Sequence, residues 1–165
     1  MPEDVVVRPA LPGDAPYLAR LSAPFVADDL LVARTTAQFR GRIGDYLAAV
    51  RGVRVVGCVG LTRAGEDLLL YNLCVASDLQ GHGIGGRLLE EAEAFAARGG
   101  RRFLLAASKY SGRWFARHGF TEVEPRRMPE AWAGLLPRGR GSRLYRRAVA
   151  RPRNTPSVHH DSVRS

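Results

Sequence analysis

The stretch LQGHGIGGRLLEE, Leu79–Glu91, holds four glycines within six residues and then continues as an amphipathic helix. It directly follows LYNLCVA (Leu70–Ala76), an apolar run typical of a strand. At a helix start, successive backbone N–H groups lack intrahelical partners, and the helix dipole adds partial positive charge. Glycine lets an anion approach such a backbone closely. The stretch therefore predicts an anion-binding turn between a strand and a helix.

Three nucleotide-binding patterns compete for this turn. A P-loop needs lysine and a hydroxyl residue after its last glycine, whereas Arg-Leu follows here. The dinucleotide fingerprint G-x-G-x-x-G is matched literally, but it should follow the first strand of a parallel fold and precede an acidic residue about 20 positions on. Here it lies mid-chain, and the later stretch RRFLLAAS has no acid. The third pattern, Q/R-x-x-G-x-G/A, is met by Gln80, Gly83 and Gly85. It predicts a cradle for the pyrophosphate of coenzyme A.

Length and composition limit the kind of protein. The 165 residues, 45% of them hydrophobic, predict a single domain over residues 1–150. Residues 151–165 have little to bury, so we expect disorder there. No apolar run approaches a membrane span of about 20 residues, and the N-terminal MPEDVVVRP lacks signal-peptide features, which favours the cytoplasm. The net charge of +9 suits anionic partners, but no lysine-rich run or basic aromatic ladder indicates nucleic acid.

Hydrophobic periodicity predicts the order strand, two helices, three strands, helix, strand, helix, two strands. The strands are expected at Val5–Arg8, Tyr46–Val50, Val53–Thr62, Leu68–Val75, Phe103–Ala107, Phe120–Val123 and Arg143–Val149. The helices are expected after a cap at Asp14, after a cap at Thr35 or Thr36 with a stop at Gly44, after the glycine turn up to Gly99-Gly100, and over Ser111–His118, with Pro24–Arg34 as a loop. This order predicts an α+β fold, a mixed and mostly antiparallel sheet flanked by helices.

The two cysteines, Cys58 and Cys74, both lie in apolar, strand-like runs. Neither has a histidine or cysteine at metal-ligand spacing, and His159 and His160 lie in the polar tail. We therefore expect two buried thiols that pack as small hydrophobic groups, and no metal site.

From about Val5 to Val149 the sequence resembles the GNAT superfamily of N-acetyltransferases, most specifically in LCVASDLQGHGIGGRLL and WFARHGF. The resemblance implies that acetyl-CoA is the co-substrate. It implies pyrophosphate on the turn, and pantetheine pairing with the end of one strand where that strand splays from Phe103–Ala107. The implied cofactor contacts are Leu73, Cys74, Val75, Gln80, Gly81, His82, Gly83, Ile84, Gly85, Gly86, Arg87 and Trp114.

The resemblance also implies direct attack of a neutral amine on the thioester through a tetrahedral intermediate. A backbone N–H near Cys74 or Val75 would stabilise the oxyanion. The glutamate that often serves as base is replaced here by Tyr71-Asn72, and a tyrosine is a poor base near neutral pH because its reference pKa is about 10. Trp114-Phe115 stands where a tyrosine acid is common. The candidate catalytic residues are therefore Tyr71, Ser108, Tyr110 and Ser111.

Within the superfamily the chain is most similar to amino-acid acetyltransferase domains of the N-acetylglutamate synthase type, through LLVART, VVGCVGL, SGRWFARHGFTEV, MPEAW and RGRGSRLYRR. The likeness implies that Arg34, Arg140 and Ser142, with the backbone at Cys74, bind the carboxylates of glutamate or a glutamate-like amine. Two alternatives stay open, a peptide or protein N-acetyltransferase and a non-catalytic acyl-CoA-binding module. Dimers are common among similar proteins, so a homodimer is possible, and we expect no nucleic-acid or membrane partner.

Overall fold

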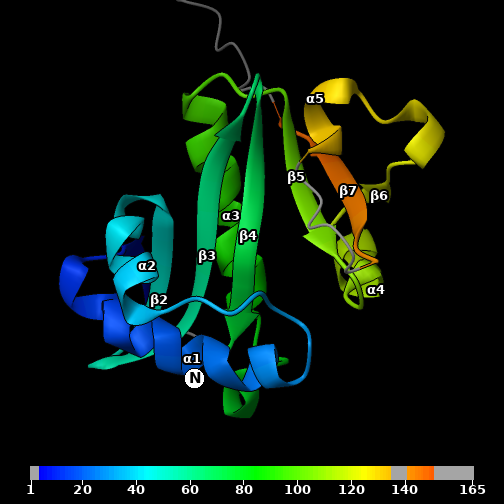
Figure 1. Cartoon of the computed structure of the whole chain (residues 1–165). Helices are drawn as coiled ribbons and strands as arrows, with labels where there is room; N and C mark the ends of the chain where they lie inside the picture. The colour runs from blue at the N-terminus through cyan, green and yellow to red at the C-terminus, as the bar shows by residue number, and fades with distance from the viewer. Residues whose placement is uncertain (1–3, 135–140, 151–165) are drawn as a thin grey trace, which may run out of the picture.

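A seven-stranded mixed sheet organises the part of the chain that the structure describes (Figure 1). The computed structural model describes residues 4–134 and 141–150; the tail expected to be disordered and Arg140 lie outside these ranges. The strand order is β1-β2-β3-β4-β5-β7-β6, and neighbours are antiparallel except for the parallel pair β4 and β5. The predicted mixed, mostly antiparallel sheet is confirmed. The strands are β1 (Val5–Pro9), β2 (Tyr46–Arg51), β3 (Arg54–Ala64), β4 (Asp67–Val75), β5 (Phe103–Ser108), β6 (Thr121–Glu122) and β7 (Arg143–Ala148).

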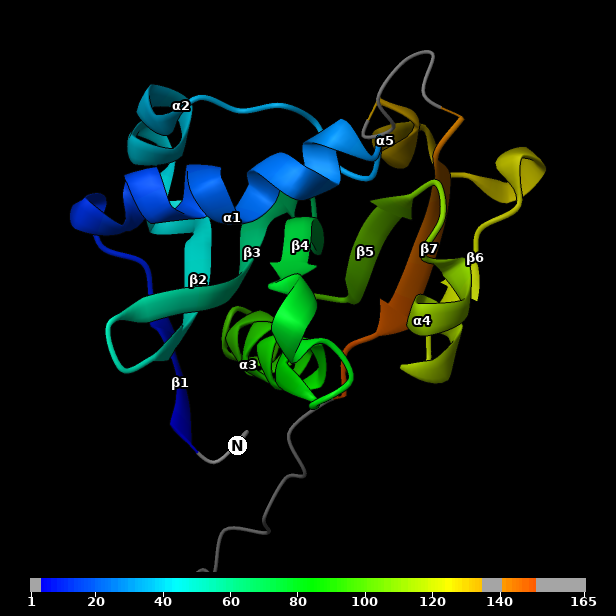
Figure 2. The same cartoon turned by 90° about the horizontal axis from the view of Figure 1, so that it is seen from below.

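Helices cover both faces of this sheet (Figure 2). Figure 2 shows α1 and α2 on one face and α3 on the other, while α4 lies beside β7 and β6. The helices are α1 (Ala15–Ala27), α2 (Thr36–Gly41), α3 (Ile84–Arg98), α4 (Gly112–Arg117) and α5 (Glu130–Ala133). Short 3-10 turns are η2 (Pro12–Asp14), η3 (Ile43–Asp45), η4 (Ser77–Leu79) and η5 (Pro125–Arg127). No helix in the described ranges is both long and apolar enough to cross a membrane.

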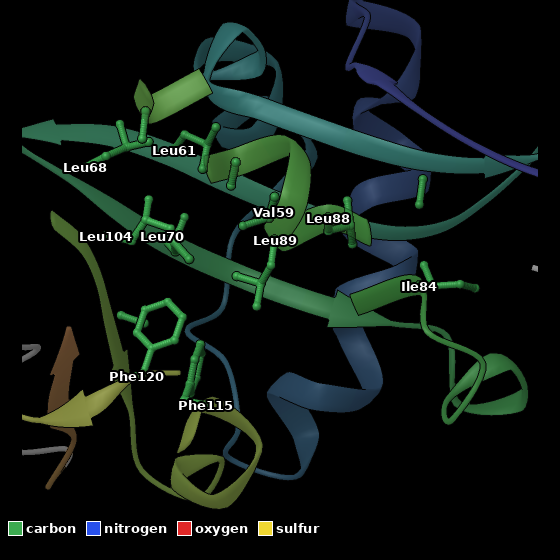
Figure 3. Close-up of a cluster of buried hydrophobic side chains, with 14 of the residues drawn as sticks. Val59, Leu61, Leu68, Leu70, Ile84, Leu88, Leu89, Leu104, Phe115 and Phe120 are labelled. Atoms are coloured by element: carbon green, nitrogen blue, oxygen red, sulfur yellow. The ribbon is translucent and has the colours of Figure 1, made fainter. Parts of the chain in front are cut away.

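The core lies on both faces of β3, whose residues 55–61 are all buried. Val55 and Cys58 pack toward α1 and α2, whereas Val56 and Val59 pack toward α3. Figure 3 shows Leu88 and Leu89 of α3 beside Val59, with the two phenylalanines Phe115 and Phe120 on the β5 side of the same cluster. A strand that is buried on both faces has a continuous apolar sequence, which is why the valine-rich stretch predicts β3 well.

Two helices differ from their predicted extents. The segment Pro24–Arg34 was expected as a loop, but α1 continues through Pro24 to Ala27. Phe25, one turn after Leu21, packs into the cluster beneath α1 and continues its apolar stripe, so packing overrides the cost of proline. The second helix ends at Gly41 instead of Gly44, and η3 follows. Its cap is Thr35, whose Oγ1 accepts the N–H of Gln38 at 3.1 Å. The short helix α5 was not predicted.

Asp14 does not cap α1 with its side chain, contrary to the sequence prediction. Its carboxylate instead turns back, accepting the N–H of Leu11 at 2.7 Å and two guanidinium hydrogen bonds from Arg8 at 2.7 and 3.1 Å. The paired Arg8 guanidinium is the main cause that lowers the pKa of Asp14 below its usual value. These hydrogen bonds of Asp14 connect the end of β1 to the residues that precede α1.

Asp14→Asn is expected to lower the free energy of unfolding by about 1.5–3 kcal/mol at pH 7, the range for hydrogen bonds to a charged group. Because the folded pKa lies below the unfolded one, the contribution is complete above the unfolded value of about 3.9 and is lost as pH falls through the folded value. Urea unfolding of both proteins at pH 7 and pH 3 checks this. A difference that grows toward pH 3 would contradict it.

A buried carboxylate fixes the start of β4 to β5 and α5. Asp67 is 1% exposed and accepts hydrogen bonds from the Nε1–H of Trp132 at 2.7 Å and the backbone N–H of Phe103 at 3.1 Å. Arg102 adds guanidinium contacts at 3.3 and 3.4 Å. Phe103 and Trp132 also meet edge to face, with ring centroids 5.9 Å apart. Burial with full hydrogen bonding makes this a structural anchor.

Trp132→Phe is expected to lower the free energy of unfolding by about 1–2 kcal/mol, because it removes a donor from a buried carboxylate. Arg102→Gln is the matched comparison, since it removes another contact of the same carboxylate from a side chain that is 55% exposed. Its cost is expected to stay below about 1 kcal/mol. Chemical denaturation of the three proteins checks the order, which a larger loss for Arg102→Gln would reverse.

Candidate active site

The glycine turn forms the predicted helix start. Gly83 is the N-cap of α3 and lies in the left-handed region with φ 81°, and Gly81 has the same φ. The first helical hydrogen bond of α3 runs from the N–H of Arg87 to the carbonyl of Gly83 at 3.1 Å. The N–H groups of residues 84–86 therefore precede the intrahelical ladder. Two of the four glycines are thus required by backbone conformation.

A third glycine of the turn is required by a packed indole. A Cβ built on Gly85 would lie 2.9 Å from Cζ2 of Trp114, and one built on Gly86 would lie 3.4 Å from Cε1 of His118. Trp114 and His118 also contact each other, with ring centroids 4.2 Å apart. Helix α4 therefore rests on the first turn of α3, so the glycines also serve close helix packing.

A cavity of about 830 Å³, called here the turn cavity, lies beside this turn. Its walls are the end of β4, the glycine turn, and one face of α4. The described residues that line it and that the sequence predicted as cofactor contacts are Leu73, Cys74, Val75, Gln80, Gly81, Gly83, Ile84, Gly85, Gly86 and Trp114. His82 and Arg87 are not among its lining residues, and Arg87 donates to the carbonyl of Val5. Arg117 and His118, which were not predicted, add basic side chains to its wall.

Strands β4 and β5 pair over only three residues each, Leu68–Leu70 with Leu104–Ala106. Beyond that point β5 stays paired with β7, while β4 stays paired with β3, so the two strands separate (Figure 1). A bulge accompanies the separation. Gly60 pairs with Tyr71 and Cys58 with Cys74, so Asn72 and Leu73 together oppose Val59. Asn72 has φ 52°, a conformation that asparagine tolerates better than most residues.

A second cavity, of about 640 Å³, lies on the α2 side of the gap and is called here the polar cavity. Its charged described lining residues are Arg34, Arg42, Asp45 and Lys109, and Ser142 lies in the same wall. The two cavities share lining residues at the gap, so they meet there: Leu30, Leu31, Leu70, Tyr71, Asn72, Ala107 and Ser108. The predicted substrate residues Arg34 and Ser142 are thus brought together, while Cys74 lines only the turn cavity.

Arg34 is held in place by the bulge. Its Nη1 donates to Oδ1 of Asn72 at 3.2 Å and to the carbonyl of Val32 at 3.3 Å, and its Cζ lies 5.2 Å from the ring centroid of Tyr71. The Nδ2 of Asn72 donates to Oγ of Ser22 at 3.1 Å in the interior. These contacts orient the guanidinium of Arg34 in the wall of the polar cavity.

Tyr71 lies at the junction of the two cavities and points into the α2 side. Its hydroxyl donates to Oδ2 of Asp45 at 2.9 Å, and its ring meets Tyr46 edge to face at 5.4 Å. Burial is the main cause that raises the pKa of Tyr71 well above its usual value, with Tyr46 and Asp45 adding to it. Burial also raises the pKa of Tyr46 to about 12. At neutral pH both phenols are therefore protonated.

The other predicted catalytic hydroxyls differ in position. Ser108 lines both cavities, and its Oγ accepts the N–H of Ser111 at 2.9 Å. Ser111 lines the turn cavity. Tyr110 is 60% exposed and lines neither cavity, with Nζ of Lys109 5.2 Å from its ring centroid. The geometry therefore favours Ser108 and Ser111 over Tyr110 as groups near the gap.

The two cysteines are free and buried, as predicted. They face each other across β3 and β4, with their sulfur atoms 3.8 Å apart. The Cys74 thiol, together with burial, raises the pKa of Cys58. No group of three or more potential metal ligands occurs within residues 4–134 and 141–150.

The turn cavity and the polar cavity meet at the gap between β4 and β5. Comparison with known proteins relates this arrangement to a family. Residues 42–122 match the model of the Acetyltransferase (GNAT) domain, so the chain contains a domain of this acetyltransferase family. An amino-acid acetyltransferase of Pseudomonas putida (strain GB-1) is 28% identical over 149 residues, 87% of this chain and 34% of the relative. An uncharacterized N-acetyltransferase of Chlorobaculum tepidum is 27% identical over 128 residues, 77% of this chain and 82% of the relative.

The fold also matches a solved structure of N-acetylglutamate synthase from Neisseria gonorrhoeae, complexed with coenzyme A and N-acetyl-glutamate. The TM-score is 0.80 at 29% identity, over 89% of this chain and 35% of that chain. The chain therefore spans about a third of the length of these amino-acid acetyltransferases. The resemblance stated from the sequence is confirmed at the level of family and fold.

Proposed function

We propose that the chain is an acetyl-CoA-dependent N-acetyltransferase that acetylates the α-amine of an amino acid with a second carboxylate, such as glutamate. One observation carries the proposal: the turn cavity and the polar cavity meet at the gap between β4 and β5. A thioester held along β4 would reach an amine held near Arg34 through that gap. The bound coenzyme A and N-acetyl-glutamate of the Neisseria gonorrhoeae synthase support the same pairing of ligands.

The turn cavity suits coenzyme A chemically. The N–H groups of residues 84–86 and the positive end of the α3 dipole favour a pyrophosphate, and Arg117 and His118 add nearby basic side chains. On binding, acetyl-CoA would supply a thioester whose carbonyl carbon the amine attacks. What the chain contributes is a strand edge for the pantetheine amides and donors for the anion.

The alternation of β4 favours one of the two oxyanion donors that the sequence left open. The N–H of Ala76 donates to the carbonyl of Val56 on β3 at 2.8 Å, so the polar groups of Val75 point the other way, toward the gap. In agreement, the carbonyl of Val75 accepts Nε2 of Gln80 at 3.1 Å. The Val75 N–H is therefore the better oriented of the two for a developing oxyanion.

The polar cavity suits an acceptor with carboxylates. Arg34, Arg42 and Lys109 line it, and Lys109 already pairs with Asp29 at 2.9 Å. Arg34 is the cation that the bulge orients. Ser142, which directly precedes β7, adds a hydroxyl to the wall of the same cavity. Arg140, the third residue implied by the resemblance, stays a prediction. A cytoplasmic location and a homodimer also stay predictions.

Thiol release from acetyl-CoA tests the proposal. Glutamate, aspartate, glutamine, lysine and a peptide with an N-terminal glutamate serve as acceptors, and coenzyme A affinity is measured by calorimetry in parallel. The highest kcat/KM is expected for a dicarboxylic amino acid. A preference for the peptide would favour a peptide acetyltransferase instead, and tight coenzyme A binding without release would favour a binding module.

A further inference from the structure

The junction of the two cavities contains a hydroxyl whose proton is already directed to a carboxylate. Of the described residues that line both cavities, Tyr71 is the one with a titratable side chain. Its hydroxyl donates to Oδ2 of Asp45 at 2.9 Å. Its oxygen carries two lone pairs, so it has the capacity to accept a proton donor besides its hydrogen-bond neighbour Tyr46.

A glycine on the neighbouring strand leaves room for the ring of Tyr71 beside Asp45. Gly60, opposite Tyr71 on β3, has no side chain, and a Cβ there would lie 2.5 Å from Cζ of the phenol ring. The ring therefore lies against the backbone of β3 and extends toward η3, where Asp45 sits. Asp45 is the last residue of η3 and lines the polar cavity with 29% of its side chain exposed. It is the single carboxylate among the described lining residues of that cavity.

We propose that Asp45 is the terminal proton acceptor of the acetyl transfer and that Tyr71 relays the proton to it. The inference deepens the proposed function and rests on it. As the amine nitrogen bonds to the acetyl carbon and the carbon–sulfur bond breaks, the sulfur leaves as the thiolate of coenzyme A. The nitrogen gives one proton to Oη of Tyr71, and Tyr71 gives its own proton to Oδ2 of Asp45. The products are the amide, the thiolate and a neutral Asp45.

This relay resolves a difficulty of the site. Tyr71 alone is a poor base, because its pKa is raised and a phenolate is costly there. In the relay the phenol loses one proton while it gains another, so no phenolate forms. The carboxylate takes the role that the family often gives to a glutamate on the strand, where this chain has Tyr71 and Asn72.

The charged surroundings of the pair are mostly cationic. Nη1 of Arg42 lies 3.7 Å from Oδ2 of Asp45, and the guanidinium of Arg34 lies over the ring of Tyr71. Tyr46, packed against Tyr71 from β2, is the remaining titratable neighbour, and it is protonated.

Four variants test the relay in the intact chain: Asp45→Asn, Tyr71→Phe, the double variant, and Asp28→Asn as a control. Asp28 is an exposed aspartate that lines neither cavity. With the best amine of the acceptor panel, Asp45→Asn and Tyr71→Phe are each expected to lower kcat about 100-fold, with KM for the amine changed less than about threefold. The double variant is expected to be no slower than the slower single variant, because both break one relay. Asp28→Asn is expected to match the wild type.

A readout independent of turnover checks the contact itself. In protein labelled at Cζ of tyrosine, the Tyr71 resonance, assigned by its loss in Tyr71→Phe, is expected to shift in Asp45→Asn and not in Asp28→Asn. Wild-type kcat in Asp45→Asn, or losses that multiply in the double variant, would overturn the relay while the proposed function stands. A wild type that releases thiol with no amine of the panel would instead overturn the proposed function, and the relay with it.

Discussion

Replacing Gly83 with alanine is expected to weaken coenzyme A binding about 100-fold. Gly83 has φ 81°, and an alanine in the left-handed region costs about 1–2 kcal/mol. The turn must either keep this strain or rotate its N–H groups away from the anion. The added methyl group also stands next to the proposed pyrophosphate position. Each 1.4 kcal/mol of lost binding is a factor of ten, so the two effects together give the expected change. Calorimetry with coenzyme A measures it.

Gly52→Ala is the matched control for backbone strain. Gly52 lies in the hairpin between β2 and β3 with φ 61°, and nothing lies within 4 Å of an added Cβ. Both variants are expected to lose a similar free energy of unfolding, about 1–2 kcal/mol, but Gly52→Ala should bind coenzyme A as the wild type does. Equal affinities for Gly83→Ala and the wild type would show that the anion binds elsewhere.

Arg34→Met is expected to raise KM for a dicarboxylic amino acid at least 100-fold and to leave coenzyme A affinity unchanged. The guanidinium is oriented by Asn72 and Val32 and stacked on Tyr71, so its loss removes a preorganised, charge-assisted carboxylate contact. Removing one partner of such a pair costs about 2–5 kcal/mol. Arg34→Lys keeps the charge without the planar fork and is expected to fall between the two. Steady-state kinetics across acceptor concentrations checks the order.

Arg40→Met controls for net charge in this second series. Arg40 is an exposed cation on α2 that lines neither cavity. Its removal changes the charge of the chain by the same amount, so KM for the acceptor should stay within about twofold of the wild type. A similar rise in both variants would mean that the overall positive field, and not a specific contact at Arg34, attracts the acceptor.

Much of the fold follows from local patterns. The valine-rich run of β3, the glycine turn after β4 and the apolar stripe of α3 are all local signals, and the structure has each in the expected place. Where a local rule and packing conflict, packing decides. Pro24 stays inside α1, because Phe25 extends the buried stripe past it. Asp14 binds Arg8 instead of capping, because a guanidinium six residues earlier is a stronger partner than the helix N–H groups.

Only part of the candidate site could be predicted from the sequence. The turn residues and Arg34 follow from motifs, and the structure brings them to two joined cavities. Asp45 was missed, because its role depends on Tyr71, a residue 26 positions away whose ring direction is set by Gly60 on a neighbouring strand. The asparagine inside an apolar strand was a signal for the bulge. Nothing local indicates that Trp114 packs on Gly85.

The anchor at Asp67 has a consequence for the distant gap. It binds the first residues of β4 and β5 to each other through Phe103 and Trp132, at the end of the strands opposite the parted ends. The three paired residues of each strand lie between this anchor and the parted ends. Asp67 lines neither cavity, yet we expect a substitution that loosens this anchor to change the separation of β4 and β5 at the gap.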